Sequence, residues 1–142
     1  MKPTTLEWIS KAEDDFHVAQ MSYRARKHPS YDASAFHSQQ CAEKYLKARL
    51  EEGGIIFVRT HDLLALHQQV LVIEPTWVVL QPFLILLNPF AVVYRYPSIS
   101  ATKVDAKDAL RNSREVRSVI RTGSRSVGVS PASAWTEIES GV

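Results

Sequence analysis

The sequence has little cysteine and glycine, and it lacks a long uninterrupted apolar run. Cys41 is the only cysteine among 142 residues, which excludes an intrachain disulfide and a cysteine-built zinc site, so we expect its thiol to be packed in the core. The adjacent Gly53 and Gly54 are not followed by the lysine and hydroxyl residue of a phosphate-binding loop. Residues 75–94 are apolar and uncharged, but Pro82 and Pro89 interrupt them, which favours a bent core helix over a membrane span.

The chain also lacks a strong excess of charge, with 17 basic and 15 acidic side chains and a net charge of +2. So small an excess does not by itself indicate a nucleic-acid partner, because phosphate binding normally shows as a clustered basic face. The polar residues that follow Lys2 do not resemble a secretory signal. We therefore expect a cytoplasmic, single-domain protein, and no motif predicts a metal or a cofactor.

The hydrophobic spacing predicts an all-α fold, an antiparallel bundle of four to five helices within residues 1–121. The expected helices cover about residues 4–27, 30–52, 60–73, 76–87 and 101–121, with the fourth bent at Pro82. The first helix is expected to bury Leu6, Ile9, Phe16, Ala19 and Tyr23, and the last helix Ala106, Ala109, Leu110, Val116 and Ile120. Residues 55–58 indicate an extended connector, and residues 122–142 a flexible C-terminal tail.

Cap residues predict where the second and third helices begin. Ser30 or Asp32 is expected to cap the second helix, which ends at Gly53-Gly54. Thr60 is expected to cap the third helix, and Asp62 lies near its positive end, where a carboxylate is stabilising. The short break at residues 28–30 predicts that the first two helices form a hairpin.

Polar side chains recur in the second helix at positions where a helix normally buries apolar ones. Gln39, Gln40 and Glu43 fall beside the apolar stripe at 3.6 residues per turn. A buried amide or carboxylate destabilises the fold unless its hydrogen bonds are made. These groups therefore indicate contact with another helix, another subunit or a polar ligand, and their spacing does not distinguish the three.

Residues 35–48 (Ala-Phe-His-Ser-Gln-Gln-Cys-Ala-Glu-Lys-Tyr-Leu-Lys-Ala) resemble the signature helix of the HEPN family, in which an aromatic and a histidine precede a Gln-Gln pair and then Glu-Lys. Two further segments are similar to family segments in the same order: Thr60-His61-Asp62-Leu63-Leu64 and Tyr94-Arg95-Tyr96-Pro97. The first helix also resembles that of the family through Trp8, Ala12, Asp14 and Asp15. The resemblance covers about residues 4–121.

The resemblance implies a homodimer that forms through the helical hairpin and works beside a separately encoded minimal nucleotidyltransferase, in many cases as a toxin and antitoxin pair. It would also bring together a set of polar residues as a nucleotide-binding or interface site: His37, Gln40, Lys44, His61, Asp62, Arg95 and Tyr96. Arginine holds phosphate through its planar fork, and a tyrosine ring can stack on a base. A nucleotide or RNA is therefore the expected ligand.

The first alternative is a divergent, metal-independent ribonuclease in which His61 or His37 transfers the proton and Arg95 stabilises charge on the phosphate. The family's nuclease branch carries an arginine followed, after four to six residues, by a histidine. No arginine and histidine of this sequence have that spacing, so a binding module is expected before an enzyme. The second alternative is a protein-interaction scaffold without catalytic activity.

Several of these residues also have a purely structural interpretation. Arg95 would bond helix carbonyls or the carboxylates of Asp14 and Asp15, and His61 would help to cap its helix. Asp14 and Asp15 are adjacent and point about 100° apart on a helix, so they cannot form a catalytic dyad on their own. One surface residue and one buried salt bridge are expected instead.

The final helix carries a stripe of arginines: Arg111, Arg114, Arg117, Arg121 and Arg125. Cations three or four residues apart lie on one helix face, and near the carboxyl end they are favoured by the helix dipole. The stripe therefore indicates a solvated helix face, with contact to a phosphate backbone as the alternative.

Overall fold

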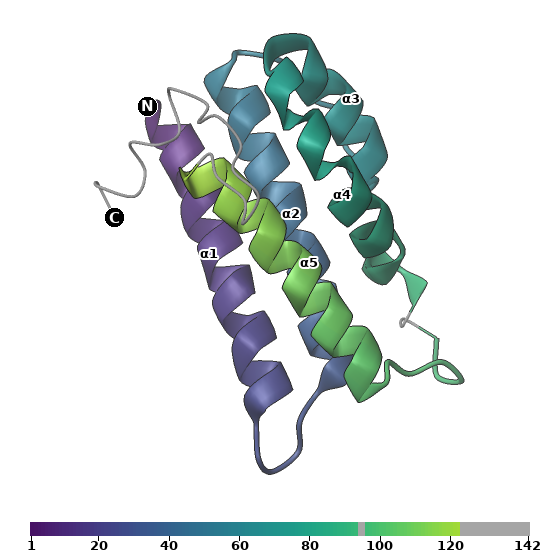
Figure 1. The fold of residues 1–142 in the computed structure, drawn as a ribbon. Coiled ribbons are helices and arrows are strands. Elements are labelled where there is room, and N and C mark those ends of the chain that lie inside the picture. The colour runs from purple at the N-terminus through teal and green to yellow at the C-terminus, as the bar shows by residue number, and fades with distance from the viewer. Residues whose placement is uncertain (94–95, 123–142) are drawn as a thin grey trace.

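The computed structural model describes residues 1–93 and 96–122, and every regular element in these ranges is helical (Figure 1). The five α-helices are α1 (Pro3–Arg24), α2 (Tyr31–Glu52), α3 (Leu63–Ile73), α4 (Gln81–Leu87) and α5 (Lys103–Thr122). Two 3₁₀ helices flank α4: η1 (Pro75–Leu80) and η2 (Asn88–Ala91). The predicted all-α bundle is confirmed. Thr122 still belongs to α5, and the rest of the predicted tail, residues 123–142, lies outside the described residues.

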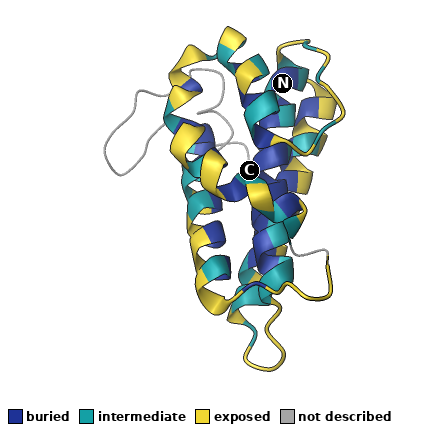
Figure 2. Cartoon of the chain, turned by 90° about the vertical axis from the view of Figure 1, so that its right-hand side faces the viewer, coloured by how far each residue is buried: buried dark blue, intermediate teal, exposed yellow. Residues whose placement is uncertain are grey.

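Helix α2 is the central element of the bundle. It packs against α1, α5 and α3, and α5 in turn packs against α4 (Figure 1). Four fully buried alanines of α1 and α2 leave room for these two helices to approach closely: Ala12, Ala19, Ala35 and Ala42. Buried residues, dark blue in Figure 2, line the inward sides of the helices, and exposed residues, yellow, line the outward sides.

The start of α3 differs from the prediction. Asp62, and not Thr60, is the N-cap, because its carboxylate accepts a hydrogen bond from the backbone N–H of Leu64. Thr60 instead accepts from the N–H of Asp62 and so supports the residue that caps the helix. Asn88 fixes both, since its side chain donates to Asp62 and accepts from the N–H of Leu63. At α2 the prediction holds, because Ser30 caps the helix by accepting from the N–H of Ala33.

The fourth helix, predicted over residues 76–87 with a bend at Pro82, is not one bent α-helix. The apolar segment 75–91 divides into η1, α4 and η2, and a proline lies in the first turn of each one, where its missing N–H is not needed. The segment is also not buried on all sides, because Val78, Ile85 and Leu86 are exposed. Among the described residues, no helix is both long enough and apolar enough to span a bilayer.

Most core positions predicted from spacing are confirmed, including all five of those on α5. Two positions on α1 differ from the prediction. Tyr23 is only partly buried, and Leu6 is 49% exposed while the neighbouring Thr5 is buried and donates a hydrogen bond to Glu52. Cys41 is buried as expected. Burial raises the pKa of its thiol to about 12, against a smaller lowering by a hydrogen bond with Ser113, so the thiol stays protonated at neutral pH.

A buried histidine joins α3 to η1. Nε2 of His67 lies 2.8 Å from the carbonyl oxygen of Trp77 and donates to it, and both residues are almost fully buried. Burial disfavours the charged imidazolium and lowers the pKa of His67, although the bond to Trp77 opposes this. The neutral ring is therefore part of the folded state.

This histidine should make stability depend on pH. Below its ordinary pKa of 6.5 the unfolded chain binds a proton that folded His67 does not, so the free energy of unfolding should fall as the pH decreases. His67→Gln keeps a donor for Trp77 but cannot titrate, and its stability should fall less between about pH 7 and pH 5. Urea unfolding followed by circular dichroism measures this. The exposed His17→Gln is the control, and equal slopes for wild type and His67→Gln would contradict the prediction.

Candidate functional site

The polar residues of α2 are buried, and their partners belong to the same chain. Nε2 of Gln39 donates to the backbone carbonyl of His61 at 2.9 Å. The amide of Gln40 donates to Gln39 at 2.7 Å and to Glu43 at 3.3 Å. The segment before α3 thus closes over these amides. A second subunit is not required to make their hydrogen bonds.

Two buried carboxylates each hold one histidine and one lysine. Asp15 of α1 binds Nδ1 of His37 at 2.7 Å and also the ammonium of Lys44. Glu43 of α2 binds Nδ1 of His61 at 2.8 Å and the ammonium of Lys47 at 3.1 Å. We call these six residues the polar seam: Asp15, His37, Lys44, Glu43, His61 and Lys47.

The carboxylates determine which ring nitrogen of each histidine is available. An ionised carboxylate only accepts hydrogen bonds, so Nδ1 carries the proton in both rings. Nε2 of each ring makes no hydrogen bond with any residue in the described ranges. The ring of His61 is 57% exposed and that of His37 30% exposed, so both can reach a ligand. Nε2 of an imidazole oriented in this way can accept a proton, and the imidazolium that results can donate a hydrogen bond to an anion.

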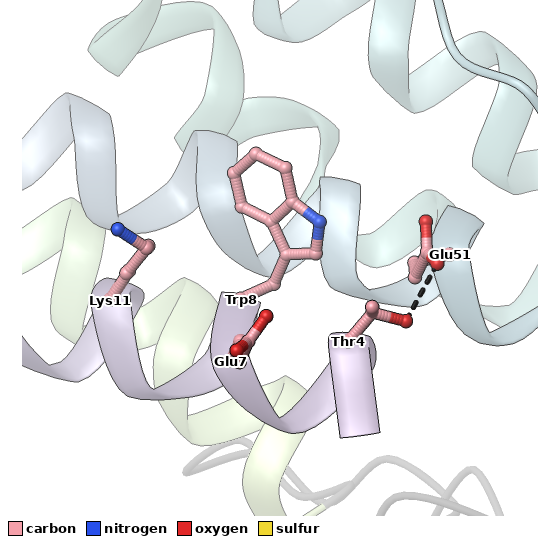
Figure 3. Close-up of a pocket in the computed structure, with 5 residues that line it drawn as sticks. All are labelled: Thr4, Glu7, Trp8, Lys11 and Glu51. Carbon is pink, nitrogen blue, oxygen red and sulfur yellow. Dashed lines mark hydrogen bonds between the residues drawn. The ribbon is translucent and has the colours of Figure 1, made fainter. Parts of the chain in front are cut away.

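Aromatic rings flank the seam on its Lys47 side. The ammonium of Lys47 lies 5.6 Å from the ring centre of Trp8 and 5.8 Å from that of Phe57, and the two rings meet edge to face. Beside them is a surface pocket of about 230 Å³ lined by Thr4, Glu7, Trp8, Lys11 and Glu51. Figure 3 shows the indole of Trp8 between Lys11 and the hydrogen-bonded Thr4 and Glu51.

The arginine stripe predicted on the last helix is divided between different partners. Arg117 forms two hydrogen bonds of 2.7 Å with Glu13, and the buried Arg121 lies 3.7 Å from the same carboxylate. Arg111 pairs with Asp108, and Arg114 lies over the ring of Phe16. Arg125 lies outside the described residues. Arg117 and Arg121 therefore join α5 to α1 and do not form an open basic face.

Glu13, Tyr45, Arg117 and Arg121 form one cluster, and the pKa of Glu13 is shifted within it. Burial alone would raise the pKa of Glu13, but hydrogen bonds from Arg117 and Tyr45 outweigh it, and the pKa lies below its usual range. Burial and the Glu13 carboxylate raise the pKa of the Tyr45 hydroxyl, which donates to Glu13 at 2.6 Å. The cluster connects α1, α2 and α5.

Among the other predicted site residues, Gln40 bonds Glu43 of the seam, whereas no hydrogen bond in the described ranges joins Asp62 or Tyr96 to it. Asp62 caps α3 and accepts a hydrogen bond from Asn88, and His61 is not the cap. Tyr96 is 66% exposed. Arg95 lies outside the described residues. His37 and Lys44 share Asp15, whereas Gln40 and His61 share Glu43.

Sequence reasoning missed Lys47, Trp8 and Phe57 as parts of this site. The signal for Lys47 was present, since it follows Glu43 by one helical turn and can pair with it. Phe57 carried no such signal, because only the fold brings it to Trp8. In the described part of the chain, no group of three or more His, Cys, Asp or Glu side chains is arranged to hold a metal.

Comparison with known proteins identifies the family. The HEPN domain family model matches residues 5–122. The chain belongs to the HEPN family. A protein of Methanocaldococcus jannaschii named "Putative toxin MJ1304" is 33% identical over 131 residues, covering 80% of this chain and 84% of the relative. No solved structure matches significantly.

The structure gives a physical reason for the signature of this HEPN domain. Gln39 and Glu43 both bond His61, which lies in the segment that leads into α3. Gln40 supports them by donating to Glu43. The two motifs recognised separately in the sequence are thus the two sides of one hydrogen-bonded contact.

Two adjacent aspartates test the importance of the seam for stability. Asp15→Asn removes the charge that holds Lys44 and His37, and we expect it to lower the free energy of unfolding by about 1–3 kcal/mol. Asp14→Asn is the matched control, because Asp14 is exposed and makes no ion pair with a described residue. Urea unfolding near pH 7 measures both. Equal stability of the two variants would contradict a stabilising role for Asp15.

Proposed function

We propose that this HEPN protein is the toxin-type member of a toxin–antitoxin pair and that it binds a nucleotide or RNA at the polar seam. The observation that carries the proposal is the presence of two partly exposed histidines, each oriented by a buried carboxylate that also holds a lysine. The printed name of the M. jannaschii relative supports the toxin role. Resemblance to the family supports a separately encoded minimal nucleotidyltransferase as the partner.

The seam has the groups that a nucleotide requires. In the imidazolium form, Nε2 of His61 and of His37 can donate to phosphate oxygens while Nδ1 stays bonded to its carboxylate. Lys44, whose side chain is 24% exposed, adds a positive charge beside them. The ring of Trp8 offers an apolar face next to Lys47, on which a base can stack. Phosphate contacts and stacking together would orient the ligand between the seam histidines and Trp8.

Replacing the exposed histidine tests the proposal directly. His61→Ala should weaken nucleotide or RNA affinity about tenfold, because one hydrogen bond to a charged group contributes about 1.5 kcal/mol. Titration of the purified chain with ATP and with a short RNA measures this. His17→Ala removes an exposed histidine elsewhere on α1 and should leave affinity unchanged. Absence of saturable binding by the wild-type chain would favour a protein-interaction scaffold instead.

The same variants report on the toxin role in cells. Induced expression of the wild-type chain in a bacterial host should arrest growth, and co-expression of the proposed nucleotidyltransferase partner should restore it. His61→Ala should arrest growth less than His17→Ala does. Normal growth on expression of the wild-type chain would contradict the toxin assignment.

A divergent metal-independent ribonuclease is the second candidate. The contact of 2.8 Å between His61 and the buried Glu43 favours it, because a carboxylate-oriented imidazole is a suitable general base. Incubating the same preparations with RNA in the presence of a chelator distinguishes the two functions. Cleavage that His61→Ala abolishes would make the protein an enzyme, and intact RNA with the wild-type chain would exclude cleavage.

The proposed homodimer requires an apolar surface, and the outer side of α4 and α5 offers one. A pocket of about 310 Å³ lies there, lined by Leu86, Phe90, Asp105, Asp108, Arg111 and Asn112. Leu86 is 57% exposed. Charges of both signs around an apolar centre suit a two-fold contact, in which a patch meets a copy of itself. The hairpin, where the family resemblance places the dimer, exposes Leu6, Val18 and Met21.

Charge insertion at each face distinguishes the two surfaces. In size exclusion with light scattering, the wild-type chain should have twice the mass of 16.0 kDa, and Leu86→Glu should reduce it to that of one chain. Met21→Glu, the same kind of change on the hairpin, should remain dimeric. The opposite pattern would place the interface on the hairpin, and a monomeric wild type would contradict the dimer.

A further inference from the structure

Exposed cations gather at the end of the bundle where α1 turns into α2. Arg24, Arg26 and Lys27 lie at this turn, and Lys103 and Lys107 lie in the first turns of α5. Figure 1 shows the turn and the start of α5 at the same end of the molecule. A hydrogen bond from the backbone N–H of Ala101 to Asp32 ties the two segments together. We call these five cations the basic end.

The basic end does not contribute to the stability of the fold through ion pairs. None of its five cations forms a salt bridge with a residue in the described ranges, whereas Lys44, Lys47, Arg49, Arg117 and Arg121 all have acidic partners. Lys103 also lies in the first turn of α5, where the helix dipole disfavours a cation. Mutual repulsion of like charges adds to this cost. A polyanionic partner would offset both the unfavourable helix dipole at Lys103 and the repulsion among the cations.

The backbone of the turn is strained in a way that presents these side chains. His28 has a φ of 54°, in the left-handed region that favours glycine, at a cost of about 1–2 kcal/mol. The turn is closed by a hydrogen bond of 3.0 Å from the N–H of Ser30 to the carbonyl of Ser22. The neighbouring Arg26 and Lys27 are held at the tip, fully outside the helices.

Position and neighbours favour single-stranded RNA as the partner. His37 lies six residues after the start of α2, on the order of 10 Å along the helix, so a strand bound at the basic end can extend to the polar seam. The exposed Tyr96 belongs to the segment that leads into α5, whose first turns carry Lys103 and Lys107, and it supplies a ring for base stacking. Phosphate contacts combined with stacking are typical of single-strand recognition.

We propose that the basic end, together with Tyr96, binds the backbone of single-stranded RNA and delivers the strand to the polar seam. This inference rests on the proposed function, because it assigns RNA as the ligand. It adds a second contact surface that is separate from His61 and Glu43. The turn between α1 and α2 and the start of α5 then form one electrostatic site.

The test uses the full chain and a fluorescein-labelled single-stranded RNA of 20 nucleotides and mixed sequence. Fluorescence anisotropy between about 50 and 200 mM KCl gives the affinity and its salt dependence. Arg26→Gln/Lys27→Gln and Lys103→Gln/Lys107→Gln should each weaken binding about tenfold and reduce the slope of log K against log salt by about 1–2. Tyr96→Ser should weaken binding with the slope unchanged, and Tyr96→Phe should restore it.

The matched control is Lys2→Gln/Arg114→Gln, which removes two exposed cations that lie outside both the basic end and the polar seam. Unchanged binding by this control supports a localised site, and equal weakening by control and basic-end variants overturns it. Equal affinity for a DNA duplex of the same length, or for anionic vesicles, overturns the assignment to single-stranded RNA. Circular dichroism melting of each variant confirms that the fold is retained.

The outcomes also separate this inference from the proposed function. If basic-end variants bind RNA normally while His61→Ala does not, the basic end is wrong and the polar seam stands. If only the basic-end variants lose RNA binding and the wild-type chain does not arrest growth, the basic end is supported as an RNA-binding surface and the toxin role is contradicted. If the wild-type chain binds no RNA, this inference is overturned.

Discussion

The burial of acidic side chains between α1 and α2 is the constraint on which the rest of the structure depends. Glu43 and Asp15 are almost fully buried and Glu13 partly so, and an ionised carboxylate removed from water must be paired. Each of the three therefore selects partners from a different segment. Asp15 pairs with His37 on α2, and Glu43 pairs with His61 in the segment before α3. Glu13 pairs with Arg117 near the end of α5. The helices are thereby held in one register.

The same pairing connects stability with the proposed site. Glu43 would be a costly residue if it only joined α2 to the next segment, since an apolar residue of similar size could fill the space. Its position instead fixes the ring of a largely exposed histidine, with the free nitrogen away from the carboxylate. A group that both holds the fold together and orients His61 explains why this helix keeps amides and acids in its interior. It also implies that the site is preorganised before any ligand arrives.

Much of the architecture follows from local patterns, and the errors have identifiable causes. The order of the helices, the α2 cap and the α5 core follow from periodicity and capping chemistry. Thr60 and Asp62 are both good N-caps, and only the presence of Asn88 from a later segment decides in favour of Asp62. Leu6 fits the periodic stripe, but the end of α2 presents Glu52 to Thr5 and leaves Leu6 in solvent. The arginines of α5 are equivalent in the sequence pattern, but in the fold only Arg117 and Arg121 pair with Glu13.

The sequence by itself determined the helical class, the family and the identity of the polar helix, because periodicity and short motifs are local properties of the chain. Only the tertiary structure decided which acid of one segment pairs with which cation of another, since the pairs Glu43–His61 and Glu13–Arg117 join residues 18 and 104 positions apart. The joining of the α1–α2 turn to the start of α5 is of the same kind, as it rests on a contact between Asp32 and Ala101. Such contacts depend on how helices pack, and helix packing is not encoded in any single segment.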